Sequence, residues 1–390
     1  MKIALVSSDN SKVFQSGGKH IHQNLLEKGF KELNYNINVY YPPVNYNILS
    51  LFFLSLKNFN KIFDTSLPVM KKKLFLEHKL NYFRNLKLSN YNIVHAHDVL
   101  SAYGVNHSNI ILTLHGYFAK EGLNYNDFSE KEKNKIYNYY YNIEKKALKN
   151  VKQIIAVDTR IKEYLINEFK FPEEKIEVIY NFIDTDKFKV IDDIEKNKLR
   201  EELNIPKKSF IVLVPRRYVD KNGVIYAARA FKNMNDNFYF IFIGRGPLKE
   251  RVSDILKNNK NARVLDNVDH DNIVKYYQVS DVVLIPSITT NEGIEEATSL
   301  SMLEGMACEK YVVCSNIGGM KEVIRDGVNG FLINQKSEKE IIKIINYIYQ
   351  NSEKLSYIRS NAREYVVENH GYIQYINKLI KIYEKLLNRK

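Results

Sequence analysis

Two glutamates, Glu296 and Glu304, stand eight positions apart in the stretch EGIEEATSLSMLEGMACEKYVV (292–313). Eight residues make a little over two turns of helix, so a helix would bring both carboxylates near one face. Carboxylates accept hydrogen bonds from hydroxyl groups. The pair is therefore suited to hold the hydroxyls of a sugar or a ribose.

The residues around these glutamates predict an anion site. A strand, DVVLIPS (281–287), comes before them, and the small polar run Ala297-Thr298-Ser299 opens the predicted helix. Free backbone N–H groups at a helix N-terminus, here around Thr298 to Leu300, and the helix dipole attract a negative charge. Phosphate at the helix end and hydroxyls on two carboxylates together indicate a sugar nucleotide.

Further residues with chemical potential lie where predicted strands end. In the first half, strands with helical spacers recur at NIVHAHD (92–98) and IILTLHG (110–116), which end in His97 and His115. In the second half, the strand that begins at Ser209 is followed by Arg216 and Lys221, five positions apart in one loop. Ligands of parallel sheets bind at the carboxyl ends of strands, and two fixed cations there suit a diphosphate.

Alternating strands and helices predict an α/β chain of parallel sheets covered on both sides. The first strand and helix (2–8 and 19–33) flank Gly17-Gly18, and a second such unit begins near Ser209. Both starts are Rossmann-like, although no Gly-x-Gly-x-x-Gly dinucleotide motif follows either strand. At 390 residues the chain is long enough for two domains.

The ordered motifs resemble the retaining glycosyltransferases of the GT-B fold, specifically glycosyltransferase family 4. Glu296 and Glu304 match its Glu-x7-Glu signature, and Arg216 with Lys221 match its "GR…KG" loop, with Pro215 in place of the usual glycine. Similarity continues through the "GxGP" turn at 244–247, the "NGID…F" segment at 180–188, where Phe182 replaces glycine, and residues 311–334. Glu309 and Tyr311 depart from its "ACGxPVV" pattern.

The resemblance implies two Rossmann-like domains facing a cleft, 1–180 and 181–370, with a last helix (371–390) that crosses back onto the first. It implies that Arg216 and Lys221 hold the donor diphosphate, Glu304 the ribose hydroxyls and Glu296 the sugar hydroxyls, while His115 lies against the sugar. Which of Arg216 and the adjacent Arg217 points inward stays open. The other implied contacts are Thr298, Ser299, Leu300, Gly244, Gly246 and Val268 for the donor, and Gly17, Gly18 and His97 for the acceptor or phosphate loop.

The implied reaction transfers a sugar from a nucleotide diphosphate sugar to an acceptor hydroxyl with retention of the anomeric configuration. No cofactor and no metal site are expected, because no Asp-x-Asp stands at a predicted strand end in a metal-binding setting, and Asp184-x-Asp186 lies in the connecting segment. Alternatives are another GT-B enzyme such as a nucleotide-sugar epimerase, a non-catalytic relative that binds sugar nucleotides, and a nucleic-acid-binding protein. No recognition motif supports the last, so we expect no nucleic acid partner.

Composition adds expectations about location. Lys+Arg 58 against Asp+Glu 45 gives a net charge of +13, which suits an anionic partner or reflects heavy lysine use throughout. Residues 45–90 mix apolar residues with lysines such as Lys71, Lys72 and Lys73, which fits either a membrane-surface element or core helices with a wet basic face. Two cysteines and no long apolar run predict a cytoplasmic protein, peripheral at the membrane if it docks there.

Overall fold

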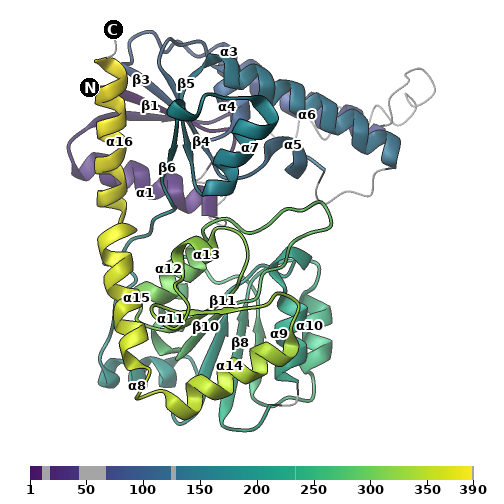
Figure 1. The fold of residues 1–390 in the computed structure, drawn as a ribbon, viewed down its shortest axis with the longest axis vertical. Coiled ribbons are helices and arrows are strands. Elements are labelled where there is room, and N and C mark those ends of the chain that lie inside the picture. Colours follow the sequence, from purple (N-terminus) through teal and green to yellow (C-terminus); the bar gives the residue numbers. More distant parts are fainter. Residues whose placement is uncertain (11–17, 44–66, 124–128, 233, 389–390) are drawn as a thin grey trace. The chain divides into compact units, whose positions relative to one another are not determined.

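The computed structural model describes residues 1–10, 18–43, 67–123, 129–232 and 234–388. The chain divides into two compact units (Figure 1). Unit 1 comprises residues 1–179 and 376–390, and unit 2 comprises residues 180–375.

Unit 1 is built on a six-stranded sheet in the order β2-β1-β3-β4-β5-β6, and each neighbouring pair is parallel. Its central strands read as unbroken apolar runs because helices cover both faces. The order reverses direction at β1 and β3, so the segments that leave these two strands diverge and leave room for a ligand between them. The strands are β1 (Lys2–Val6), β2 (Asn36–Tyr40), β3 (Ile93–Ala96), β4 (Ile110–Leu114), β5 (Val151–Ala156) and β6 (Ile176–Val178).

The helices of unit 1 connect these strands, and the last helix of the chain joins them. In α16, Tyr383 is buried, and its ring stacks on Phe30 of α1 with the centroids 6.2 Å apart. Its hydroxyl lies 2.6 Å from Nδ1 of His95 on β3, so the end of the chain is fixed to the sheet. The helices are α1 (Gly18–Glu32), α3 (Leu67–Arg84), α4 (Val99–Gly104), α5 (Phe118–Glu121), α6 (Glu130–Asn150), α7 (Thr159–Phe169) and α16 (Tyr372–Leu387), with a 3-10 turn at Glu173–Lys175.

Unit 2 holds a second parallel sheet, in the order β12-β11-β10-β7-β8-β9. This is the doubly wound dinucleotide-fold order, with its switch point between β7 and β10. Apolar side chains fill both faces of the sheet, in two core clusters that include Leu213 and Val283 on one side and Val212 and Val282 on the other. The strands are β7 (Phe210–Val214), β8 (Phe238–Ile243), β9 (Ala262–Leu265), β10 (Val282–Ile285), β11 (Tyr311–Ser315) and β12 (Phe331–Ile333).

The segment that begins unit 2 shows how Phe182 is accommodated where the family that the sequence resembles carries glycine. Phe182 is buried and packs on Tyr375 with ring centroids 4.1 Å apart, and the neighbouring Ile183 forms a bridge with Gly371. The helices of unit 2 are α8 (Asp193–Glu202), α9 (Val224–Phe231), α10 (Lys249–Leu256), α11 (Ile273–Val279), α12 (Leu300–Ala307), α13 (Met320–Val323), α14 (Glu338–Asn351) and α15 (Ser356–Asn369), with a 3-10 turn at Asp220–Asn222.

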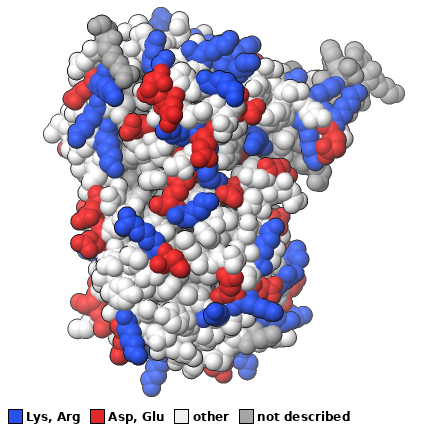
Figure 2. Space-filling model, in the orientation of Figure 1, with Lys and Arg blue, Asp and Glu red and all other residues white. Residues whose placement is uncertain are grey.

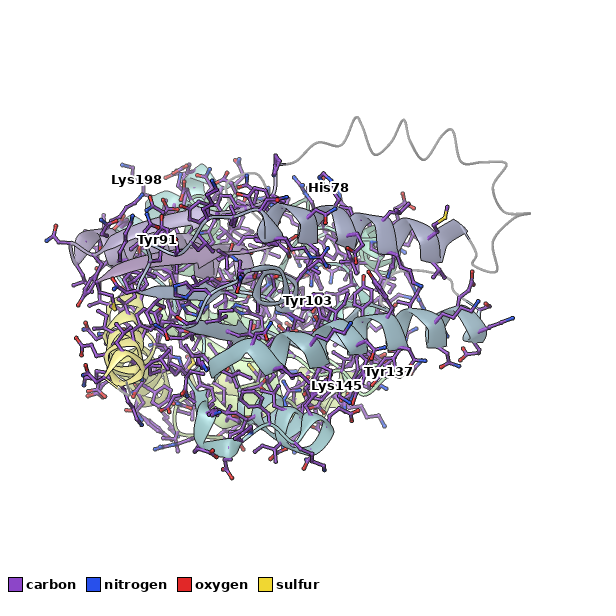
Figure 3. The ribbon with its side chains drawn as sticks, turned by 90° about the horizontal axis from the view of Figure 1, so that it is seen from above. His78, Tyr91, Tyr103, Tyr137, Lys145 and Lys198 are labelled. Carbon is purple, nitrogen blue, oxygen red and sulfur yellow. The ribbon has the colours of Figure 1, made fainter. Side chains whose placement is uncertain are left out.

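Helices α3 and α6 run alongside each other in unit 1 (Figure 3). Lys72 of α3 donates to the carbonyl of Gly122, and Lys73 lies 5.1 Å from the ring centroid of Tyr139 on α6. Two lysines of the basic segment are therefore engaged within the unit. Figure 2 shows lysine and arginine side chains over α3 and the outer end of α6. The apolar run at 46–56 lies outside the described residues.

The prediction of an α/β chain with two Rossmann-like parallel sheets is confirmed. Among the described residues, no helix combines the length and the apolar character that crossing a bilayer requires.

Candidate functional site

The largest group of candidate residues gathers in unit 2 at the switch point between β7 and β10. Arg216 follows β7 by two residues, and Ser287 follows β10 by two residues. Because the two strands are parallel neighbours, their carboxyl ends lie at the same edge of the sheet. This edge therefore collects side chains from segments that are far apart in the sequence.

Arg216 is the centre of this group. Its side chain is 8% exposed, and Nη2 lies 2.9 Å from Oε2 of Glu296. The guanidinium also donates to the hydroxyls of Ser299 and Ser287 at 3.2 and 3.0 Å, and to Oδ1 of Asn222 at 2.7 Å. A buried guanidinium held by this many partners has a fixed orientation. Arg217 is exposed, so Arg216 is the arginine that points into the group.

Glu296 carries the negative charge of the group. Burial alone would raise the pKa of its carboxyl, but the charges of Arg216 and Lys221 outweigh burial and lower that pKa to about 2. The ammonium of Lys221 lies 3.8 Å from Oε2 of Glu296. The carboxylate is therefore ionised at physiological pH. It contributes stability above about pH 4.5, and that contribution is lost as the pH falls toward 2.

The prediction that one helix carries both glutamates is wrong for Glu296. Helix α12 begins at Leu300, and Glu296 lies in the preceding connection. Long-range contacts hold this connection out of a helix: the carbonyl of Glu296 accepts from the N–H of Gly319 at 3.0 Å, and the carbonyl of Thr298 accepts from the amide of Asn181 at 2.8 Å. Helical periodicity cannot anticipate such partners. Glu304 does lie on α12.

The N-terminus of α12 has no side-chain cap. Ser299 occupies the N-cap position, but its hydroxyl accepts from Arg216 instead of capping the helix. Thr298 and Ser299 are both buried, and Leu300 is the first helical residue. The first backbone N–H groups of α12 thus adjoin the Arg216 guanidinium, which makes this corner electropositive.

Glu304 lies inside the same unit with a histidine beside it. Its side chain is 5% exposed, and Oε1 lies 3.3 Å from Nε2 of His270. The other nitrogen of His270, Nδ1, lies 2.9 Å from the ammonium of Lys187. An ammonium only donates, so Nδ1 accepts and the hydrogen sits on Nε2, which donates to Glu304. Burial, reinforced by the charge of Glu304, also raises the pKa of the neighbouring Tyr277 well above its usual value.

Gly244 and Gly246 allow the turn after β8 to approach the turn after β7. A Cβ at Gly244 would lie 2.2 Å from the carbonyl oxygen of Arg216. At Gly246, where φ is +150°, a Cβ would lie 2.3 Å from the carbonyl oxygen of Tyr218. Neither position has room for a side chain. Val268, after β9, packs half-buried against the core cluster on the α12 side of the sheet.

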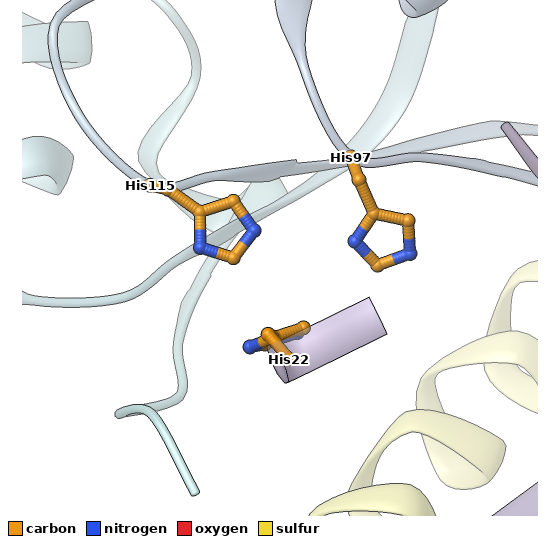
Figure 4. Close-up of side chains that lie close together, drawn as sticks. All are labelled: His22, His97 and His115. Atoms are coloured by element: carbon orange, nitrogen blue, oxygen red, sulfur yellow. The ribbon is translucent and has the colours of Figure 1, made fainter. Parts of the chain in front are cut away.

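In unit 1, His97 and His115 lie at the ends of β3 and β4, and His22 of α1 faces both (Figure 4). The ring centroids of His22 and His115 are 4.7 Å apart, and those of His22 and His97 are 5.7 Å apart. Burial, and then the neighbouring histidines, lower the pKa of both His97 and His115 well below the usual range. Both rings are therefore neutral at physiological pH.

An ionic cluster adjoins these histidines. Lys19 lies 2.8 Å from Asp98 and 3.0 Å from Asp9, and Lys79 lies 2.8 Å from Asp9. Asp98 also accepts from the N–H of Ser8 at 2.8 Å, which ties the end of β1 to the end of β3. Burial opposes the charge of Asp98, but Lys19 lowers its pKa overall. Gly18 begins α1, and Gly17 lies outside the described residues.

Each unit thus brings several of the candidate residues together. Unit 2 brings together Arg216, Lys221, Glu296 and Ser299, with Gly244 packed on the backbone of Arg216. Sequence reasoning missed several partners that position them: Ser287 and Asn222 for Arg216, His270 for Glu304, Asn181 for Thr298, and Glu295, which accepts from the N–H of Gly318 at 2.9 Å. Only Ser287 carried a readable signal, as a polar residue at a strand end.

Comparison with known proteins covers both units. Residues 36–187 match the family model described as Glycosyltransferase Family 4, and residues 195–365 match the model described as Glycosyl transferases group 1. An uncharacterized glycosyltransferase of Methanocaldococcus jannaschii is 27% identical over 238 residues, which make up 60% of each chain. The match therefore spans less than two thirds of that relative.

Other similarities extend over more of the chain. The UDP-Gal:alpha-D-GlcNAc-diphosphoundecaprenol alpha-1,3-galactosyltransferase of Escherichia coli is 24% identical over 331 residues, 80% of each chain. The crystal structure of Anabaena HepE in complex with UDP-glucose superposes with a TM-score of 0.68 at 18% identity, covering 98% of this chain and 100% of the other. Each of the two doubly wound units thus matches a glycosyltransferase family model, and the chain has the GT-B fold.

Proposed function

We propose that this glycosyltransferase moves a sugar from a nucleotide diphosphate sugar to an acceptor hydroxyl, with retention of the anomeric configuration and without a metal ion. The observation that carries the proposal is the Arg216 group of unit 2. A buried guanidinium, the ammonium of Lys221 and an uncapped helix N-terminus meet at the switch point of a doubly wound sheet. That combination suits a diphosphate.

The neighbouring carboxylates fit the rest of such a donor. Glu304 lies beside a histidine that donates to one of its oxygens, and its second oxygen is suited to ribose hydroxyls. Glu296 is assigned to the sugar hydroxyls, and Gly244 with Gly246 to the nucleoside side. Two known proteins give independent support: the name of the Escherichia coli relative includes UDP-Gal, and HepE was crystallised with UDP-glucose.

In the proposed step, the bond between the anomeric carbon and the diphosphate oxygen breaks, and a bond to the acceptor oxygen forms on the same face of the sugar. The acceptor proton passes to the departing diphosphate. Negative charge grows on that leaving group, and Arg216 with Lys221 would stabilise it more in the transition state than in the ground state. We assign His115, whose ring is neutral, to the reacting sugar, and Gly17, Gly18 and His97 to the acceptor side.

A panel of nucleotide sugars tests the proposal. We expect at least one to raise the melting temperature of the protein, and to be consumed faster when an acceptor is added. The anomeric coupling constant of the product reports whether configuration is retained. A donor that yields only free sugar or an isomerised nucleotide sugar in every acceptor mixture would contradict transfer.

Replacing Glu304 by alanine is expected to weaken donor binding by about 10- to 150-fold. The variant loses a charge-assisted hydrogen bond, which contributes about 1.5–3 kcal/mol. Calorimetric titration with the donor measures the change in affinity. The control is Glu353→Ala, which also removes one carboxylate but at an exposed position. Equal affinity in the two variants would remove Glu304 from the donor site.

We further propose that the acceptor is lipid-linked and that unit 1 docks on an anionic membrane from the cytoplasmic side. The name of the Escherichia coli relative contains a diphosphoundecaprenol. On α3, Phe75 is 42% exposed, and the exposed Lys87 follows the helix. An exposed aromatic ring and an exposed basic residue in one segment are features of surfaces that lie in a lipid interface.

We expect the protein to float with vesicles that contain anionic lipid at low salt, and less at high salt. The double variant Phe75→Ser, Lys87→Glu should bind at least roughly fivefold more weakly, since each basic residue near the surface contributes about 1 kcal/mol. Lys198→Glu, a charge reversal on the exposed face of α8 (labelled in Figure 3), is the matched control. Protein that stays with the soluble fraction at low salt would rule the surface out.

A further inference from the structure

Three histidines of unit 1 converge from three separate elements. Figure 4 shows the rings of His22, His97 and His115 turned toward one another, from α1 and from the ends of β3 and β4. Each offers one ring nitrogen, and these atoms all lie within 4.8 Å of one another. His22 and His97 are 0% and 1% exposed, while His115 is partly exposed, so His115 is the residue of the three that solvent reaches.

This spacing is close to that of a bound transition metal. Zinc–imidazole bonds of about 2.0–2.1 Å in a tetrahedral site put ligand nitrogens roughly 3.4 Å apart and ring centroids roughly 5 Å apart. The three centroid distances here are 4.7, 5.7 and 6.3 Å. The backbone at each histidine belongs to a helix or follows the end of a strand. Small rotations of the side chains would therefore be enough to bring the ring nitrogens to the spacing of a bound metal.

We propose that His22, His97 and His115 bind one transition-metal ion of the zinc class, with a fourth coordination position open on the side of His115. Three imidazoles without a carboxylate suit Zn²⁺, Co²⁺, Ni²⁺ or Cu²⁺ and do not suit Mg²⁺ or Ca²⁺, which require oxygen ligands. A three-histidine site with one open position is the arrangement of metal sites that accept an exchangeable ligand.

The charges around the group allow a cation to enter. Lys19 is a fixed positive charge close enough to act on His97 and His115, and it is paired with Asp98 at 2.8 Å and Asp9 at 3.0 Å. Asp9 is shared with Lys79, so the two ammoniums and two carboxylates balance. Among the described residues, no hydrogen-bond partner meets either ring nitrogen of His97. Since partners behind the ligands normally strengthen metal binding, we expect an exchangeable ion rather than a permanent one.

A metal here would inhibit transfer, a consequence that rests on the proposed function. His115 and His97 are the residues assigned to the sugar and the acceptor. An ion coordinated by both rings would withdraw their nitrogens from substrate and occupy the space beside them. The reaction proposed above needs no metal, so the ion acts as a reversible block rather than as a cofactor.

The binding test uses the full-length protein stripped with a chelator and titrated with Co²⁺. We expect the intense visible bands of four-coordinate Co²⁺, which one equivalent of Zn²⁺ then abolishes. Zn²⁺ should also raise the melting temperature in a saturable manner, because it binds the native state. His22→Ala should weaken binding by at least about 100-fold. His78→Ala, which removes an exposed histidine of α3, is the matched control and should leave binding unchanged.

Two results would overturn the site. One is a wild-type spectrum with only the weak bands of six-coordinate Co²⁺, and the other is a folded His22→Ala variant that keeps the four-coordinate spectrum. If His22→Ala fails to fold, His22→Gln or X-ray absorption on the zinc-loaded wild type, which counts imidazole ligands, decides instead. Three imidazoles in the absorption fine structure support the site, and one or none refutes it.

The activity test separates this site from the proposed function. Zn²⁺ is expected to slow sugar transfer by the wild type reversibly, and His22→Ala should lose that sensitivity. Four-coordinate Co²⁺ without any inhibition would keep the metal site and contradict the placement of His115 at the reacting sugar. Inhibition that persists unchanged in His22→Ala would contradict the regulatory role.

Discussion

Arg216→Ala is expected to lower the rate of sugar transfer by about 10²–10³, the loss typical for one preorganised group that stabilises developing charge. The guanidinium is buried, and four side chains fix its direction: Glu296, Ser299, Ser287 and Asn222. It therefore needs no reorganisation when the diphosphate leaves. The measurement is the turnover of donor and acceptor at saturation, with circular dichroism to confirm that the variant is folded.

Arg217→Ala is the matched control, because the adjacent side chain is exposed and should matter little. Lys221→Ala should act in the same direction as Arg216→Ala, and the double variant should fall short of the product of the two, since both cations meet one charge. Excess chelator should leave wild-type turnover intact. Turnover that disappears with chelator and returns with Mg²⁺, while Arg216→Ala stays near wild type, would contradict the assignment.

The elements of the fold could be predicted because their signals are local. Runs such as FIVLV (β7) and VVLI (β10) are apolar throughout, as strands covered on both faces must be. Their order in the sheet comes from right-handed crossovers that the alternation of strands and helices implies. That order brings Arg216 and Ser287 together. A polar residue at the end of a strand can therefore be predicted from the sequence as a candidate for the site.

The details of the candidate site depend on contacts across long stretches of sequence. Asn181 reaches Thr298 across 117 positions, and His270 reaches Glu304 across 34. Helical periodicity placed Glu296 on α12, but its ion pair with Arg216 and the hydrogen bond from Gly319 hold it in the preceding connection. Contacts with distant residues likewise decide which of Arg216 and Arg217 points into the group. Because the two residues are identical and adjacent, the sequence alone does not distinguish them.

Gly223→Ala is expected to destabilise unit 2 by about 2–5 kcal/mol, the largest stability loss that we expect from a single methyl group. Gly223 has φ of +63°, a conformation that costs other residues about 1–2 kcal/mol. A Cβ there would also lie 1.7 Å from the carbonyl oxygen of Pro286, and forcing atoms into a packed region costs about 1–3 kcal/mol more. Urea denaturation of the full-length protein measures the change.

Gly293→Ala separates the two causes, because Gly293 has φ of +73° but nothing within 4 Å of its would-be Cβ. It should lose only the backbone cost of about 1–2 kcal/mol. Of the two glycines, Gly223 is the one beside Lys221, in a loop that packs against the segment after β10. There the N–H of Ile288 donates to the carbonyl of Lys221 at 2.8 Å. Pushing that loop away would move Lys221 from Glu296, so Gly223→Ala should lose donor affinity as well as stability, whereas Gly293→Ala should keep it. Equal losses of stability in the two variants would mean that backbone strain, and not the contact with Pro286, is what glycine relieves at this turn.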